Sequence, residues 1–147
     1  TYVCGNILPT KEQIALHQES YNTLFNACSE AVVGKTNADI GKHLNSPTGN
    51  PNSDGLSGGH GAGVNPWEPP WVANLSPDAI IPLQEGMLFS IEPYAGKPGI
   101  GGFRLENQVF VGKKDPNVFT KLSFDERLVK DVHPLDKSTG RKRSYPK

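Results

Sequence analysis

Three side chains of types that bind divalent cations stand out in the sequence: His60, Glu92 and Glu106. One imidazole and two carboxylates suit an ion of borderline hardness, such as manganese, iron, cobalt or zinc. Such an ion can activate a water molecule or polarise a carbonyl group near neutral pH. A second interpretation is open at this point, in which both glutamates are outward-facing strand residues and the histidine is an ordinary loop residue.

The two glutamates are expected on neighbouring strands, over residues 87–94 and 102–111, which form a hairpin around a glycine-rich turn. In each strand apolar and polar residues alternate, so the apolar side chains face a core and Glu92 and Glu106 lie on the opposite face. The hairpin can therefore bring the two carboxylates together. Two like charges in that position need a cation, or one of them must hold a proton.

His60 lies in the glycine-rich segment 58–63, where missing side chains let the backbone approach a bound group closely. Loop composition extends over residues 45–59, and an irregular, proline-rich stretch is expected over residues 65–85. A stretch of about fifteen residues without regular structure is long for a compact domain. We therefore expect residues 45–59 to be either disordered or functional.

Upstream of these segments the sequence predicts a long helix. Thr10 is placed as its N-cap, with Gln13 three residues later in the spacing of a capping box, and Gly34 is placed to end it. Apolar residues recur along this helix at three-, four- and seven-residue steps, which predicts one buried face. Three shorter elements are also expected: a strand end over 1–4, a second helix over 36–44 and a helical turn over 123–129.

Three motifs occur in order along the chain: GHGAGV at 59–64, GMLFSIEP at 86–93 and GFRLEN at 102–107. Together they resemble the C-terminal half of the pita-bread metallopeptidase family (creatinase/aminopeptidase, or M24, type). This family includes methionine aminopeptidases, Xaa-Pro aminopeptidases, prolidases and creatinase. The resemblance implies an α+β fold, a curved antiparallel sheet backed by helices. It implies two parts: 1–133, a partial catalytic domain lacking its N-terminal aspartate strands, and 134–147, a basic tail.

By the same resemblance, His60, Glu92 and Glu106 match three of the five ligands of a centre with two divalent metal ions (manganese, cobalt, iron or zinc). Glu106 would bridge the two ions. Glu92 would bind one ion and would also accept a proton from the attacking water. Arg104 is placed on the substrate side of this centre, either as an ion-pair partner that steadies the carboxylates or as an ordinary strand arginine.

Two departures from the family pattern limit what the resemblance implies. The remaining two ligands of the family are aspartates on strands that precede the segment matching Thr1, so we expect this chain alone to bind metal weakly or as a single ion and to be inactive. The peptidases also carry a second histidine seven residues after the first, where this sequence has Trp67. Trp67 and Trp71 either wall a substrate pocket or pack in the core.

Three functions therefore stay open. The first is a metal-dependent hydrolase that resembles Xaa-Pro aminopeptidases and dipeptidases and acts on a small molecule or a short peptide. The second is a non-peptidase member of the same fold, similar to the dimethylsulfoniopropionate lyases or the creatinase-like C–N hydrolases. The third is a binding module that has lost catalysis.

Composition excludes several other classes of protein. The 15 basic and 15 acidic residues balance, unlike those of most nucleic-acid-binding domains. No apolar run approaches the roughly 18 residues that cross a bilayer. Because no secretory signal is visible, Cys4 and Cys28 are interpreted as reduced thiols of a cytoplasmic protein. The single methionine is Met87, so we expect a processed or partial chain, whose open sheet edge favours a homodimer.

Overall fold

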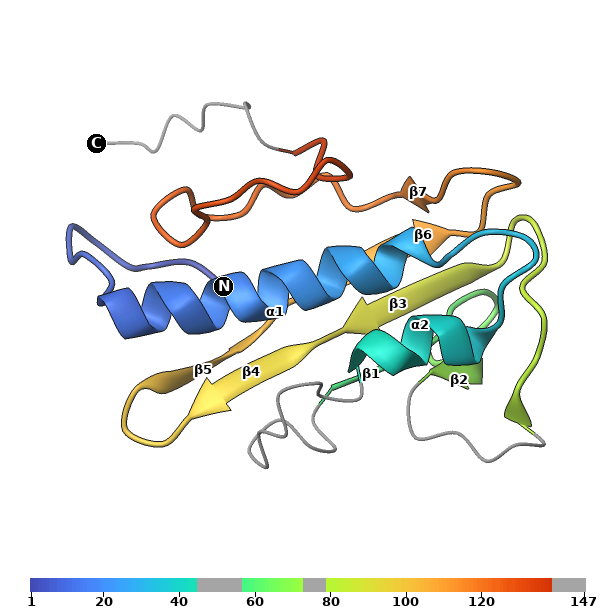
Figure 1. Cartoon of the computed structure of the whole chain (residues 1–147), viewed down its shortest axis with the longest axis horizontal. Helices are drawn as coiled ribbons and strands as arrows, with labels where there is room; N and C mark the ends of the chain where they lie inside the picture. The colour runs from blue at the N-terminus through green and yellow to red at the C-terminus, as the bar shows by residue number, and fades with distance from the viewer. Residues whose placement is uncertain (45–56, 73–78, 139–147) are drawn as a thin grey trace.

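The computed structural model of the chain describes residues 1–44, 57–72 and 79–138. They form an α+β fold in which two helices pack on one side of antiparallel strands (Figure 1). The elements in chain order are α1 (Lys11–Ser29), α2 (Asn37–Leu44), β1 (Gly58–Gly61), β2 (Glu68–Val72), β3 (Leu88–Glu92), β4 (Tyr94–Lys97), β5 (Gly101–Arg104), β6 (Asn107–Phe110) and β7 (Asn117–Val118). Strands β2, β1, β3, β6 and β7 form one sheet in that order, and β4 pairs with β5 in a second sheet.

Helix α1 begins as the sequence predicts, because Thr10 is its N-cap and forms a capping box with Gln13. The Thr10 hydroxyl accepts the Gln13 N–H at 3.2 Å, and the Gln13 side chain accepts the Thr10 N–H at 2.9 Å. The predicted end of the helix is wrong. The helix ends at Ser29, because the N–H of Glu30 turns back to two carbonyls of the last turn. Gly34 instead has φ +93° in the turn toward α2, a conformation that favours glycine.

The core lies between α1 and the central strands. The predicted apolar face of α1 is buried, and it includes Tyr21, Leu24, Phe25 and Cys28. These side chains pack with the apolar residues of the sheet, among them Phe89, Ile91 and Val109. Removing this apolar surface from water is the main force that holds the helix on the sheet.

The predicted hairpin is confirmed in its pairing but differs in its strands. Strand β3 pairs with β6 and β4 pairs with β5 in one continuous antiparallel register. Each expected strand is divided in two, because Pro93 has no backbone N–H to donate to the ladder. The Leu105 N–H still donates to the Pro93 carbonyl at 3.2 Å, so the two halves of the hairpin remain connected.

Residues 1–4 do not form the predicted strand. Side chains of a later segment bind the backbone of Val3. The Val3 N–H donates to Asp125 at 2.9 Å, and Arg127 donates to the Val3 carbonyl at 2.6 Å. The hydrogen bond from Arg127 lowers the pKa of the buried Asp125 carboxyl to about 2. Within the segment 123–129, where a helical turn is predicted, residues 126–128 form a hydrogen-bonded turn, in which the Leu128 N–H donates to the Asp125 carbonyl at 2.9 Å.

The prediction of an irregular stretch over residues 65–85 is wrong in part, because β2 lies within it. Strand β2 contains Pro69 and Pro70. A strand accommodates prolines at the edge of a sheet, where a missing N–H breaks no ladder on the solvent side. Strand β2 has this edge position beside β1.

Residues 134–138, at the start of the predicted basic tail, contact α1. The hydroxyl of Tyr21 donates to Asp136 at 2.8 Å, and both residues are buried. The rest of that tail, residues 139–147, and most of the loop predicted over residues 45–59 lie outside the described residues. Within the described part of the chain, neither helix is long and apolar enough to cross a membrane.

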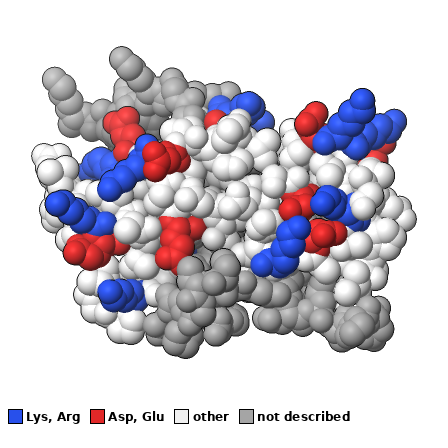
Figure 2. Space-filling model, in the orientation of Figure 1, with Lys and Arg blue, Asp and Glu red and all other residues white. Residues whose placement is uncertain are grey.

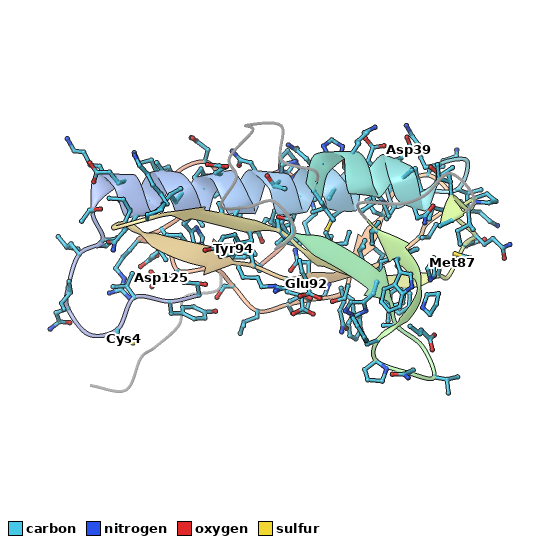
Figure 3. The ribbon with its side chains drawn as sticks, turned by 90° about the horizontal axis from the view of Figure 1, so that it is seen from below. Cys4, Asp39, Met87, Glu92, Tyr94 and Asp125 are labelled. Atoms are coloured by element: carbon cyan, nitrogen blue, oxygen red, sulfur yellow. The ribbon has the colours of Figure 1, made fainter. Side chains whose placement is uncertain are left out.

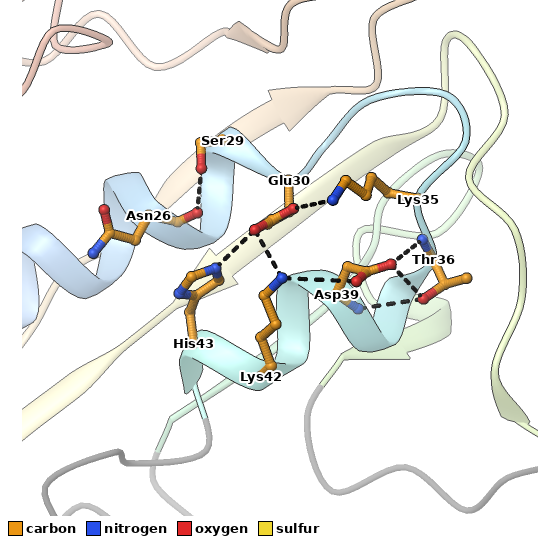
Figure 4. Close-up of polar contacts among 8 residues, drawn as sticks. All are labelled: Asn26, Ser29, Glu30, Lys35, Thr36, Asp39, Lys42 and His43. Atoms are coloured by element: carbon orange, nitrogen blue, oxygen red, sulfur yellow. Dashed lines mark hydrogen bonds and ion pairs between the residues drawn. The ribbon is translucent and has the colours of Figure 1, made fainter.

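A cluster of charged side chains joins α2 to the end of α1 (Figure 4). Glu30 accepts hydrogen bonds from Lys42 at 2.9 Å and from His43 at 3.0 Å. It also pairs with Lys35 at 3.2 Å. Burial raises the pKa of Glu30, but the donors His43, Lys42 and Lys35 outweigh it and lower the pKa to about 2. Acidic and basic side chains are interspersed across the face shown in Figure 2.

Candidate metal centre

The register of the hairpin places Glu92 opposite Glu106. Both residues alternate with core residues, since Ile91 and Leu105 are buried on the helix side. The two carboxylates therefore belong to the opposite face of the sheet. Figure 3 shows Glu92 on this face, with both helices on the other side.

His60 reaches the same region from β1, where it lies opposite Ser90 of β3. Its Nε2 atom is 3.1 Å from Oε1 of Glu92, although the two residues are 32 positions apart in the chain. The histidine is buried, and it is a strand residue rather than a loop residue. The fold thus brings together two of the three side chains that the sequence singles out.

The glycines beside His60 have a role in the packing of the strands. A Cβ on Gly59 would lie 2.7 Å from a backbone oxygen of β3, and a Cβ on Gly61 would lie 2.7 Å from a backbone oxygen of β2. The missing side chains therefore let the two neighbouring strands approach β1 closely. This close approach seats His60 against β3.

Both ring nitrogens of His60 face oxygen acceptors. Nδ1 is 2.9 Å from the Gly61 carbonyl oxygen, while Nε2 faces Glu92. A neutral imidazole has a single N–H and can donate to only one of these acceptors. Two arrangements satisfy both oxygen acceptors. In one the ring is an imidazolium that donates from both nitrogens, and in the other a neutral ring donates from Nδ1 while a cation binds Nε2 and the Glu92 carboxylate. Metal-binding histidines commonly have this second arrangement, so the pair fits a divalent cation.

The second oxygen of Glu92 has its own partner. The guanidinium of Arg104, on β5, forms an ion pair with Oε2 of Glu92. Of the two interpretations of Arg104 given above, this contact agrees with the ion-pair partner. Because the arginine side chain is half exposed, the pair lies at the solvent side of the face that carries the carboxylates.

Glu106 is connected to these residues less directly. Its Oε1 atom accepts a hydrogen bond from the Ser90 hydroxyl at 2.5 Å. Among the described residues, no group of three or more histidine, cysteine or acidic side chains is close enough together to hold a metal ion. Of the three predicted ligands, His60 and Glu92 are therefore in contact, and Glu106 lies on the adjacent segment of the hairpin.

Trp67 and Trp71 lie beside the histidine. The two indole rings meet edge to face with centroids 4.8 Å apart, and they lie 6.2 Å and 6.4 Å from the His60 ring. Trp67 is 65% exposed and Trp71 is 39% exposed. Neither ring packs in the core, so the second of the two interpretations given above is wrong, while a role in a substrate pocket stays a prediction.

Sequence reasoning missed two polar residues of this region, Ser90 and Asn37. Strand alternation is a signal for Ser90, since it shares a face with Glu92. Asn37, the first residue of α2, is fully buried, donates to the Trp71 carbonyl at 2.9 Å and accepts the Ile81 N–H at 2.8 Å. No sequence signal marks this asparagine, because its partners lie far along the chain.

Comparison with known proteins identifies the class to which this fold belongs. The profile of Metallopeptidase family M24 matches residues 1–113. The chain therefore belongs to the M24 metallopeptidase family. The search of curated proteins gives no match.

Solved structures agree with this family. The Xaa-Pro dipeptidase from Bacillus anthracis superposes with a TM-score of 0.68 at 26% identity, over 80% of this chain and 33% of that chain. The dipeptidase PepE from Mycobacterium ulcerans superposes with a TM-score of 0.69 at 25% identity, over 84% of this chain and 33% of that chain. The prolidase from Pyrococcus furiosus superposes with a TM-score of 0.68 at 24% identity, over 79% of this chain and 34% of that chain. These likenesses confirm the predicted pita-bread fold, and the chain spans about a third of the length of the structures it matches.

Proposed function

We propose that this chain is part of a metal-dependent hydrolase that resembles Xaa-Pro dipeptidases and aminopeptidases, and that His60, Glu92 and Glu106 are its metal ligands. The observation that carries the proposal is the 3.1 Å contact between Nε2 of His60 and Glu92, on the face that also carries Glu106. Membership of the M24 family and the likeness to the Xaa-Pro dipeptidase from Bacillus anthracis support it. The complete domain would bind two ions of manganese, cobalt, iron or zinc.

Each side chain has a defined task in this proposal. Nε2 of His60 and the carboxylate oxygens of Glu92 and Glu106 would hold the metal, which would supply the Lewis acidity that activates water near neutral pH. Glu92 also accepts the proton of the attacking water. Arg104 holds Oε2 of Glu92, so that Oε1 stays directed toward the histidine.

The two tryptophans complete the substrate side of the proposed site. Their exposed rings stand beside His60, and the Asn37 amide holds the backbone of Trp71. Aromatic faces bind apolar and cationic groups. We therefore propose that Trp67 and Trp71, with Arg104, contact a small molecule or a short peptide.

Trp67 favours a second candidate function. In the resemblance to the family, its position is that of the second peptidase histidine, and its indole ring lies 6.2 Å from His60. An indole offers a single N–H and no basic nitrogen, so it cannot exchange a proton with the leaving group as an imidazole does. A lyase similar to those that cleave dimethylsulfoniopropionate, or a creatinase-like C–N hydrolase, is the alternative. A binding module without catalysis is a third.

Metal binding by the chain tests the donor set. Titration with Co²⁺, followed by its visible absorption and by calorimetry, should show one weakly bound ion per chain. His60→Ala should abolish binding. His43→Ala is the matched control, because His43 makes a similar 3.0 Å contact with Glu30 outside the site, and it should bind Co²⁺ like the parent chain. Equal binding by the His60 variant would contradict the assignment, and two stoichiometric ions would contradict the single-ion expectation.

Activity of the full-length protein distinguishes the three functions. With manganese or cobalt added, a hydrolase of the first kind cleaves a proline-containing dipeptide, and the Glu92→Gln variant does not. Turnover of dimethylsulfoniopropionate or creatine, without dipeptide cleavage, would select the second candidate. If the full-length protein bound no metal, only the binding module would remain.

We also propose that the chain forms a homodimer. Ile7 and Leu8 are exposed, and β2 and β7 are edge strands of the described sheet. Unpaired strand edges and exposed apolar residues favour association with a second copy. Light scattering during size-exclusion chromatography should give the mass of a dimer, and a monomer at every concentration would contradict the proposal.

A further inference from the structure

Ser90 occupies the middle of the proposed site. It lies on β3, opposite His60 of β1 on one side and Gln108 of β6 on the other. Its side chain belongs to the same face as that of Glu92, because the two are separated by one strand residue. The residue is only 1% exposed. A hydroxyl buried to this extent is costly unless it is hydrogen-bonded.

The partner of this hydroxyl is Glu106, whose Oε1 accepts its hydrogen bond at 2.5 Å. Glu106 lies between the end of β5 and the start of β6 and is itself exposed. The Ser90 side chain, in contrast, stands on the central strand of the sheet. Because a hydroxyl donates a single hydrogen, it holds one carboxylate oxygen and leaves the other for a different partner.

We propose that Ser90 is a positioning residue for Glu106, whose hydroxyl holds the carboxylate on the face where His60 and Glu92 meet. The proposal rests on the function proposed above, because it treats Glu106 as a metal ligand. Hydrogen-bonding partners behind the ligands of a metal commonly change its affinity by about 10- to 100-fold when they are removed. The strand position makes Ser90 a rigid support for this contact.

The test compares Ser90→Ala with Ser90→Thr in the same Co²⁺ titration. The alanine variant should bind Co²⁺ at least about 10-fold more weakly, and the threonine variant, which keeps the hydroxyl, should recover the affinity. Ser138→Ala is the matched control. Ser138 is also buried, at 5% exposure, and its hydroxyl donates to the Asp136 carboxylate at 2.5 Å, outside the proposed site. This control should lower the melting temperature but leave Co²⁺ affinity unchanged.

A double-mutant cycle separates positioning from general stability. If Ser90 acts through Glu106, then Ser90→Ala should have no further effect on Co²⁺ affinity in a Glu106→Gln background. If Ser90→Ala does not fold, Ser90→Val, which nearly matches the shape of the threonine variant but lacks the hydroxyl, should show the same loss. Unchanged affinity in the Ser90 variants that lack the hydroxyl, with Co²⁺ bound by the parent chain, would overturn this inference alone. Absence of Co²⁺ binding by the parent chain would overturn the proposed function and this inference together.

Discussion

Replacing His17 by leucine should remove much of the acid sensitivity of this fold. His17 lies on α1 and is fully buried. Its ring stands edge to face with the rings of Phe103 and Phe124, with centroids 5.5 Å and 6.3 Å apart. Neither of its ring nitrogens has a hydrogen-bond partner among the residues that the structure describes. Burial lowers the pKa of His17 from 6.5 to about 4, because the apolar surroundings disfavour the charged form.

The direction of the effect follows from the two pKa values. The unfolded chain takes up a proton at His17 below pH 6.5, whereas the folded chain resists protonation until about pH 4. The free energy of unfolding is therefore highest above that window and falls as the pH drops through it. The full difference corresponds to about 3 kcal/mol, of which about 2 kcal/mol is lost by about pH 5.

Urea unfolding followed by circular dichroism at several pH values measures this loss. The parent chain should lose stability between about pH 7 and pH 5, while His17→Leu should have a flatter profile over that range. The variant should also be at least as stable at neutral pH, since no buried nitrogen is left without a partner. His43→Leu, which removes a half-buried histidine near the surface, is the control. Parallel profiles for the parent and His17→Leu would refute the reasoning.

Three further predictions concern the supports of the fold. Gly59→Ala should destabilise the chain by about 2–4 kcal/mol, because its Cβ would lie 2.5 Å from a side chain of β2. The control is Gly58→Ala, whose Cβ would meet nothing within 4 Å and whose effect should be near neutral. Thermal unfolding of the two variants and the parent chain measures the difference. Asn37→Ala should lower the free energy of unfolding, measured with urea, by about 3 kcal/mol, because the hydrogen bonds of the buried amide are lost. The control is Asn26→Ala, which replaces an exposed asparagine and should change the free energy little. Equal losses in the two variants would contradict the role assigned to Asn37. Asp125→Asn should lower the free energy of unfolding by about 2 kcal/mol at neutral pH, because the Arg127 contact depresses the pKa of this carboxyl. As the pH falls from about 4 to 2, the parent carboxyl becomes protonated, so the free energies of unfolding of the variant and the parent should converge.

Local patterns predicted the elements that depend on neighbours in the chain. Thr10 and Gln13 interact across one helical turn, so their spacing is sufficient to locate the start of α1. Alternation in the hairpin placed Glu92 and Glu106 on the face away from the core, because side-chain direction in a strand follows the period of two. The end of α1 was missed, because Gly34 only marks a turn that lies beyond the helix.

Long-range contacts decided the rest of the candidate site. The approach of His60 to Glu92 depends on how close β1 can lie to β3, and Gly59 permits this close approach because it has no side chain. Strand β2 was not expected, because the prolines that argue against a central strand are compatible with an edge, and edge position is a property of the whole sheet.

The sequence by itself determined the family motifs, the residue types of the proposed ligands and the face on which each glutamate lies. These depend on residue identity and on the geometry of single elements. Only the tertiary structure decided that His60 meets Glu92, that Arg104 takes the second carboxylate oxygen and that Ser90 holds Glu106. The physical reason is that these contacts cross between segments whose distance and register are set by core packing and strand pairing.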